Sequence, residues 1–222
     1  MPLLAGLRVV ALDLRGHGLS DHRDGYGYAD YERDLVTLLD SLELEGVTVA
    51  GHSLGGYVAL AAATRDERIR SVVAIDVKSD WTEEEAAFAD RSRSGTQRVE
   101  ERAALEARLA RSVAPAELDA AELEAMAERS LEPVAGGWRF RWDRRVLATD
   151  PVEPFAFLGR VPCPVRVLAG AESRVMPPGR ARAFAEAIPR ATLELVDGVG
   201  HHVELEAPAI VAAALIDLAA RP

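Results

Sequence analysis

The sequence has little that would support a disulfide-linked or membrane-spanning protein. Its 222 residues include one cysteine, Cys163, which excludes an internal disulfide and a pair of cysteine metal ligands. No apolar run reaches the roughly 18 residues that a transmembrane helix needs. The apolar start, Met1 to Leu4, is too short for a signal peptide. We therefore expect a cytoplasmic protein without a membrane partner.

Positive charge is also scarce. The chain carries 26 Lys and Arg against 36 Asp and Glu, a net charge of −10 and a pI near 5.1. Such a chain repels polyanions, so we expect no nucleic-acid partner. Aromatic residues make up only 5%, but hydrophobic residues reach 49%. That is enough for the core of one domain, or of one domain with an insertion.

Strand-like and helix-like segments alternate along the chain. Short β-branched apolar runs predict buried strands, and apolar residues spaced by three or four predict amphipathic helices. The predicted strands are residues 7–12, 47–50, 69–77, 164–170 and 192–196. The predicted helices are residues 31–42, 54–64, 178–188 and 208–220. This alternation predicts an α/β fold with a mostly parallel sheet and flanking helices.

The composition changes between residues 78 and 149, where Glu, Arg and Ala dominate at helical spacing. We predict an inserted cap of two to four helices here, one of them starting after Pro115. Gly136-Gly137 predicts a turn before an aromatic segment. The cap would interrupt a core formed by residues 1–77 and 150–222.

Five residues, Gly51-His52-Ser53-Leu54-Gly55, stand between a predicted strand and a predicted helix. A serine on such a turn presents its hydroxyl at the helix N-terminus, and the glycines allow close backbone approach. Parallel sheets carry reactive groups after the carboxyl ends of their strands. Asp76 lies at the carboxyl end of the predicted strand at 69–77, and His201 follows the predicted strand at 192–196. The chain order of serine, acid and histidine is that of enzymes with a nucleophile elbow.

Three segments resemble the α/β-hydrolase-fold superfamily, in particular its capped, esterase-like serine hydrolases. They are LDLRGHGLSD at 12–21, GHSLGG at 51–56 and GVGHHVELEAP at 198–208. The strand pattern between them agrees, so the resemblance covers nearly the whole chain outside the predicted cap.

The resemblance implies roles for individual residues. Ser53 would be the nucleophile and His201 the base, since the family pattern places Gly directly before the catalytic histidine. His202 is the competing base because it is adjacent. The backbone N–H of Leu54 would supply one oxyanion donor.

The triad acid is open between two carboxylates. Many family members carry it after the strand that corresponds to residues 164–170, where this chain has Ser173 in the expected aspartate position. A subset carries the acid after the preceding strand instead, which favours Asp76. Glu172, one residue from the usual register, is the alternative acid.

The chain departs from the family near its N-terminus. The loop that normally supplies the second oxyanion donor is absent, and residues 3–7 resemble the segment before the family's fourth strand. Three short strands, about forty residues, are therefore missing. We interpret the chain as N-terminally truncated, a fragment or a misassigned start. Direct pairing of the strands at 7–12 and 47–50, or a collapsed sheet rim, are the alternatives.

The resemblance implies hydrolysis of small or medium carboxylic esters or thioesters through a Ser-His-Asp triad and an acyl-enzyme. The expected partner is a small-molecule acyl substrate, and no cofactor is implied. Its pocket would be lined by His52, Trp81, Trp138, Trp142 and His202. No metal site is predicted, because the adjacent His201 and His202 are poorly placed to share one ion.

Three other functions stay open. A cofactor-free perhydrolase or haloperoxidase-like enzyme would use the same triad, and so would a C–C hydrolase. A catalytically impaired fragment or a non-catalytic α/β-hydrolase-like domain would retain the scaffold alone.

Overall fold

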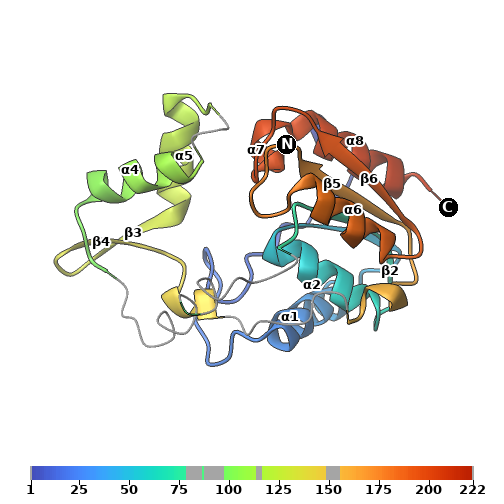
Figure 1. Ribbon diagram of the computed structural model, residues 1–222. Helices are drawn as coiled ribbons and strands as arrows, with labels where there is room; N and C mark the ends of the chain where they lie inside the picture. Colours follow the sequence, from blue (N-terminus) through green and yellow to red (C-terminus); the bar gives the residue numbers. More distant parts are fainter. Residues whose placement is uncertain (1, 79–86, 88–97, 114–116, 149–155, 222) are drawn as a thin grey trace. The chain divides into compact units, whose positions relative to one another are not determined.

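The computed structural model describes residues 2–78, 87, 98–113, 117–148 and 156–221 (Figure 1). The chain divides into two compact units. The first unit comprises Met1–Leu12, Glu32–Asp80 and Val152–Pro222. The second comprises Asp13–Tyr31 and Trp81–Pro151. The second unit therefore includes Asp13–Tyr31, a segment that we expected within the core.

The first unit is built on a parallel sheet of four strands in the order β1-β2-β5-β6. The strands are β1 (Val47–His52), β2 (Ile69–Ile75), β5 (Val165–Gly170) and β6 (Ala191–Val196). The central strands β2 and β5 are almost entirely buried, whereas β1 and β6 are mostly half-buried. Continuous apolar runs suit strands that are covered on both faces. The predicted α/β class with a mostly parallel sheet is confirmed.

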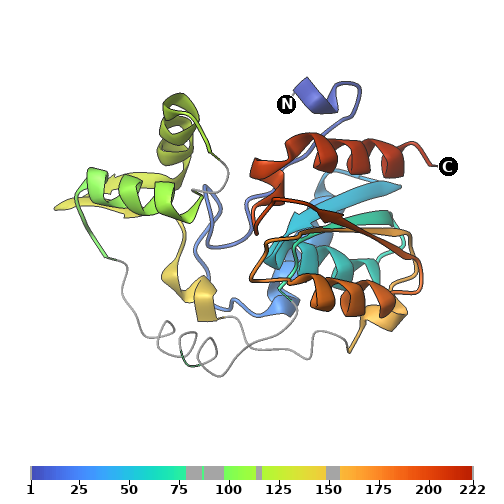
Figure 2. The same ribbon diagram turned by 45° about the horizontal axis from the view of Figure 1, so that its top comes forward.

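Helices cover both faces of this sheet (Figure 2). On one face α2 (Leu54–Ala63) packs on β1 and β2, and α6 (Pro178–Glu186) packs on β5 and β6. On the other face α8 (Pro208–Ala219) packs on β1 and β2, and the short α7 (Val203–Glu206) contacts β5. The core on this second side consists of Val73, Ile75, Leu168, Val196, Val199, Val203, Ala214 and Leu218.

Three further elements complete the helical part. The helix α1 (Tyr28–Ser41) carries the buried side chains of Leu35 and Leu39. The 3-10 turns η1 (Pro2–Leu4) and η4 (Leu158–Arg160) lie in the first unit. Among the described ranges, no helix combines the length and apolarity needed to span a bilayer.

The prediction of a strand at residues 7–12 is wrong. This stretch has no regular secondary structure, and Val9 and Val10 remain 43% and 41% exposed. Within the described ranges β1 pairs with β2 alone, so the direct pairing considered above does not occur. An apolar β-branched run becomes a strand only where a neighbour accepts its backbone hydrogen bonds, and this run has no such neighbour among the described residues.

The second unit combines two helices with a hairpin. The helices are α4 (Arg102–Ser112) and α5 (Ala120–Ser130), and the hairpin strands are β3 (Leu131–Val134) and β4 (Gly137–Phe140). The 3-10 turn η3 (Arg144–Ala148) follows. Leu105, Ala127 and Leu131 form a small core, with Leu109, Trp138 and Phe140 packed against it.

The hairpin lies where the sequence predicts a turn before an aromatic segment. Gly136 adopts φ +90° in the predicted turn, and the strands on either side pair from Val134 and Gly137 outward. The helix α5 begins after Asp119, whose carboxylate and backbone N–H bond reciprocally with Glu122. This capping box explains why the helix starts beyond Pro115.

Asp143 joins the two segments of the second unit. Its backbone N–H donates to the carbonyl of Gly16 at 2.6 Å, and its carboxylate accepts from Tyr26 Oη at 2.8 Å. Arg145 donates to both carboxylate oxygens. Burial acts to raise the pKa of Asp143, but the hydrogen bonds from Arg145 and Tyr26 outweigh it and lower the pKa to about 2.

Asp143→Asn should lower the free energy of unfolding by about 2 kcal/mol at pH 7. The folded pKa lies below that of the unfolded chain, so the stabilisation is complete above about pH 4 and is lost toward pH 2. The difference from the parent should therefore fall to roughly half at pH 3. Urea unfolding at both pH values measures it. Asp24→Asn, which alters a fully exposed partner of Arg145, should change little. An equal loss at both pH values would contradict the assignment.

Candidate active site

Ser53 occupies the tight turn between β1 and α2. Its backbone has φ +50° and ψ −114°, a combination that non-glycine residues rarely adopt. A Cβ on Gly51 would lie 2.1 Å from the carbonyl carbon of Gly55, and one on Gly56 would lie 2.7 Å from the carbonyl oxygen of Gly51. Only glycine allows this approach, so the local sequence enforces the turn. Strain of this kind is typical of functional sites.

Asp76 lies directly after β2, the neighbour of β1. His52 and Ile75 are register partners, and the N–H of Ser53 donates to the carbonyl of Ile75 at 2.8 Å. Ser53 and Asp76 therefore follow paired residues at the same end of the sheet. Asp76 is fully buried.

The buried carboxylate of Asp76 is held by three donors. Oδ1 accepts from Ser173 Oγ at 2.7 Å and from His201 Nδ1 at 2.6 Å. Oδ2 accepts from the backbone N–H of Gly170 at 3.0 Å. Burying a carboxylate is costly unless such bonds replace water. Ser173, which stands where many family members have the aspartate, therefore donates to the carboxylate that follows the neighbouring strand β2.

His201 lies on the loop after β6, with its side chain 25% exposed. Because Nδ1 donates to Asp76, Nε2 is left with its lone pair, as a general base requires. The loop is held on both sides of His201 by Glu206, which accepts from the N–H of Gly200 at 2.8 Å and of His202 at 3.2 Å. The sequence did not predict this role of Glu206, because no local pattern shows that its carboxylate returns from α7 to this loop.

The alternative acid is placed differently. Glu172 is exposed, and its carboxylate makes no hydrogen bond or ion pair within the described part of the chain. Its backbone N–H donates to the carbonyl of Val199. The structure therefore brings Asp76, and not Glu172, to His201.

The other predicted site residues separate into two groups. The rings of His52 and His202 lie 4.4 Å and 5.2 Å from that of His201, and Leu54 is the first residue of α2. The first N–H groups of a helix have no intrahelical acceptor, so that of Leu54 is available as a donor. Trp138 and Trp142 belong to the second unit. Trp81 lies outside the described residues.

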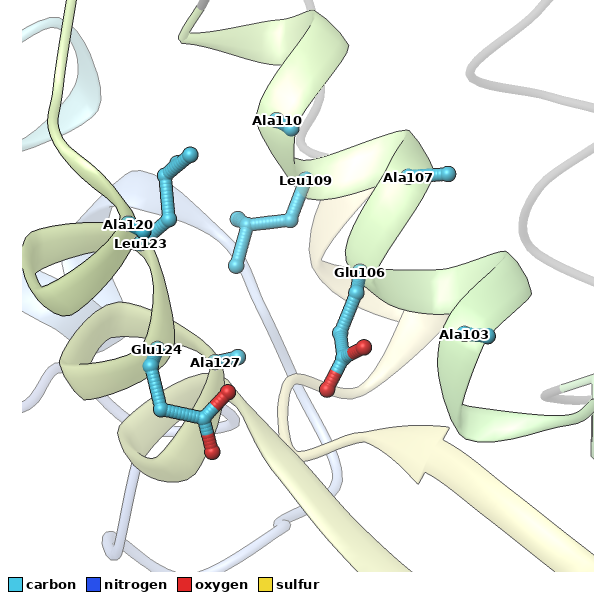
Figure 3. A pocket seen from close by; sticks show the side chains of 9 residues that line it. All are labelled: Ala103, Glu106, Ala107, Leu109, Ala110, Ala120, Leu123, Glu124 and Ala127. Atoms are coloured by element: carbon cyan, nitrogen blue, oxygen red, sulfur yellow. The ribbon is translucent and has the colours of Figure 1, made fainter.

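A cavity of about 390 Å³ lies in the second unit, between α4 and α5 (Figure 3). Its lining consists mainly of alanine and leucine side chains, with the carboxylates of Glu106 and Glu124 at one end. Both glutamates pair with Arg102. None of the lining residues is a predicted site residue, and the cavity contributes no group suited to nucleophilic catalysis.

Ser173→Ala should lower the free energy of unfolding by about 1–3 kcal/mol. The change leaves Oδ1 of Asp76 with one donor fewer and removes the acceptor of the N–H groups of Val175 and Met176. Urea unfolding measures the loss. Ser41→Ala, on the exposed end of α1, is the matched control. A loss no larger than that of the control would contradict this role.

Comparisons with known proteins agree with the fold and the motifs. The chain matches the sequence model described as "Alpha/beta hydrolase family" over residues 1–214. It is 32% identical over 212 residues to 2-(acetamidomethylene)succinate hydrolase of Mesorhizobium japonicum, covering 90% of this chain and 74% of that protein. It is 25% identical over 209 residues to the sn-1-specific diacylglycerol lipase ABHD11 of Xenopus laevis, covering 90% and 67%.

The structural comparison gives the same result. The crystal structure of E-2-(acetamidomethylene)succinate hydrolase is similar to this chain with a TM-score of 0.78 and 29% identity. The match covers 92% of this chain and 78% of that one. The chain therefore belongs to the alpha/beta hydrolase family.

Proposed function

We propose that this chain is a serine hydrolase of small or medium carboxylic esters or thioesters. The proposal rests on one observation, the 2.6 Å contact between Asp76 Oδ1 and His201 Nδ1. This contact lies at the end of the sheet where Ser53 occupies a strained turn. Ser53 is the nucleophile, His201 the base and Asp76 the acid.

The reaction follows from these positions. His201 Nε2 takes the proton of Ser53 as Oγ attacks the carbonyl carbon, and the buried carboxylate of Asp76 stabilises the imidazolium that forms. The N–H of Leu54 stabilises the developing oxyanion at the positive end of α2. The protonated His201 then gives its proton to the leaving alcohol or thiol. Water, deprotonated by His201, releases the acid and restores Ser53.

The supporting contacts favour Asp76 as the acid. It is fully buried, so its interaction with the imidazolium is weakly screened by solvent. Ser173 and Gly170 donate further hydrogen bonds to the carboxylate and hold it in place. Glu172 is exposed and makes no contact with His201 among the described residues.

The names of two relatives support this choice of substrate class. One is named for hydrolysis of 2-(acetamidomethylene)succinate and another for hydrolysis of diacylglycerol. We take an acyl compound as the substrate, because both names describe hydrolases of compounds that carry acyl groups.

The test combines a covalent probe with a substrate panel. We expect a fluorophosphonate to label the purified chain and p-nitrophenyl esters to be hydrolysed at rates that depend on acyl length. Acyl thioesters form a second arm, and addition of hydrogen peroxide forms a third. Faster turnover with peroxide than with water would favour the perhydrolase alternative. A folded chain that is neither labelled nor active would overturn the proposal in favour of a non-catalytic domain.

A further inference from the structure

Two histidines and one glutamate meet beside the proposed active site. His52 is the last residue of β1, His202 precedes α7, and Glu204 lies within α7. Each offers one ligand atom, and the three atoms lie within 4.8 Å of one another. We call these three residues the His-His-Glu cluster. Neither Ser53 nor His201 belongs to it.

We propose that the His-His-Glu cluster binds a divalent transition-metal ion of the Zn²⁺ class. The sequence suggested no such site, because it offered only the adjacent His201 and His202. Folding instead joins His202 to His52, which is 150 positions earlier in the chain, and to Glu204.

The two separations between Glu204 and the histidines suit a tetrahedral ion. Oxygen and nitrogen ligands at about 2.0–2.2 Å from Zn²⁺ lie roughly 3.4 Å from one another. Glu204 Oε1 is 3.5 Å from His52 Nδ1 and 3.2 Å from His202 Nδ1. The separation between the ligand atoms of the two histidines is at most 4.8 Å, so an ion would draw the two rings toward each other where it exceeds 3.4 Å.

The hydrogen bonds prepare His52 as a ligand. Its Nε2 lies 2.9 Å from the carbonyl oxygen of His201. A carbonyl can only accept, so Nε2 carries the hydrogen and Nδ1 presents its lone pair to Glu204. Ligating histidines commonly donate their second N–H to a carbonyl in this way.

Glu204 supplies the negative charge. Its Oε1 accepts a hydrogen bond from His202 Nδ1 at 3.2 Å. Its Oε2 is buried and has no hydrogen-bond partner among the described residues. An unpaired buried carboxylate oxygen is costly, and a cation held by both oxygens of Glu204 would satisfy it.

The ligand set selects the kind of ion. Two imidazoles and one carboxylate suit zinc and similar transition metals, whereas Mg²⁺ and Ca²⁺ prefer oxygen ligands. The three side chains are 24–30% exposed, which leaves room for solvent as a fourth ligand. The ion would replace the proton that His202 Nδ1 now shares with Glu204.

Titration of the metal-free chain with ZnCl₂ by calorimetry tests this proposal without reference to catalysis. We expect one ion per chain and no comparable binding of MgCl₂. CoCl₂ should give the visible absorption of a tetrahedral site with nitrogen and oxygen ligands. Glu204→Gln and His202→Gln should each weaken Zn²⁺ binding at least about tenfold.

Glu186→Gln, an exposed glutamate of α6, is the matched control and should bind Zn²⁺ as the parent does. Circular dichroism of each variant separates loss of the site from loss of the fold. If the folded Glu204→Gln and His202→Gln variants bind Zn²⁺ as tightly as the control, or if the parent binds none, the proposal is wrong.

Discussion

Replacing Ser53 by alanine should abolish labelling by a fluorophosphonate and slow ester hydrolysis by at least about 1,000-fold. The reagent reacts with an activated serine, and activation requires a base at hydrogen-bonding distance during the reaction. Ser53 occupies the turn that the glycines of the elbow enforce, at the same end of the sheet as Asp76 and His201. Mass spectrometry of the labelled chain and initial rates with a p-nitrophenyl ester measure the effect.

The control is an exposed serine at the end of α1. Ser41→Ala removes an exposed hydroxyl that donates to the carbonyl of Thr37, and it should leave labelling and rate unchanged. The fold of both variants is checked by thermal unfolding. If Ser53→Ala retained the label at the same stoichiometry, another residue would be the nucleophile and the proposed function would be incorrect.

Replacing Asp76 by asparagine should lower the rate of hydrolysis by about 10,000-fold, whereas Glu172→Gln should leave it within about twofold of the parent. An amide at position 76 no longer stabilises the imidazolium of His201. It also favours the wrong tautomer of that ring, because its own N–H group can face Nδ1. Initial rates of the two variants, compared under the same conditions, measure the difference.

Asp76 is fully buried, so its variant is first checked for folding by circular dichroism. A second comparison holds even if the variant is less stable. The effects of substitutions in residues that act as one unit are not additive. The double variant Asp76→Asn, His201→Gln should therefore hydrolyse the ester little more slowly than His201→Gln alone. A large loss in Glu172→Gln with Asp76→Asn unaffected would reverse the assignment of the acid.

The sequence determined the features that depend on short segments. The strands of the parallel sheet follow from their β-branched runs, and the elbow follows from glycines placed on either side of Ser53. His201 is predicted as the base because it directly follows Gly200 in a segment that resembles the family. Each of these features is formed by residues that are consecutive in the chain, so a short stretch of sequence is enough to predict it.

Only the tertiary structure decided the features that depend on distant partners. Asp76 and Glu172 are equivalent as isolated carboxylates, and the register of β2 against β1 and β5 is what places one of them beside His201. Residues 7–12 have the pattern of a strand but no partner among the described residues, so they do not form one. The His-His-Glu cluster likewise exists because β1 and α7 meet. The free energy of such a contact depends on both of the segments that form it, so the local pattern of either segment alone cannot predict it.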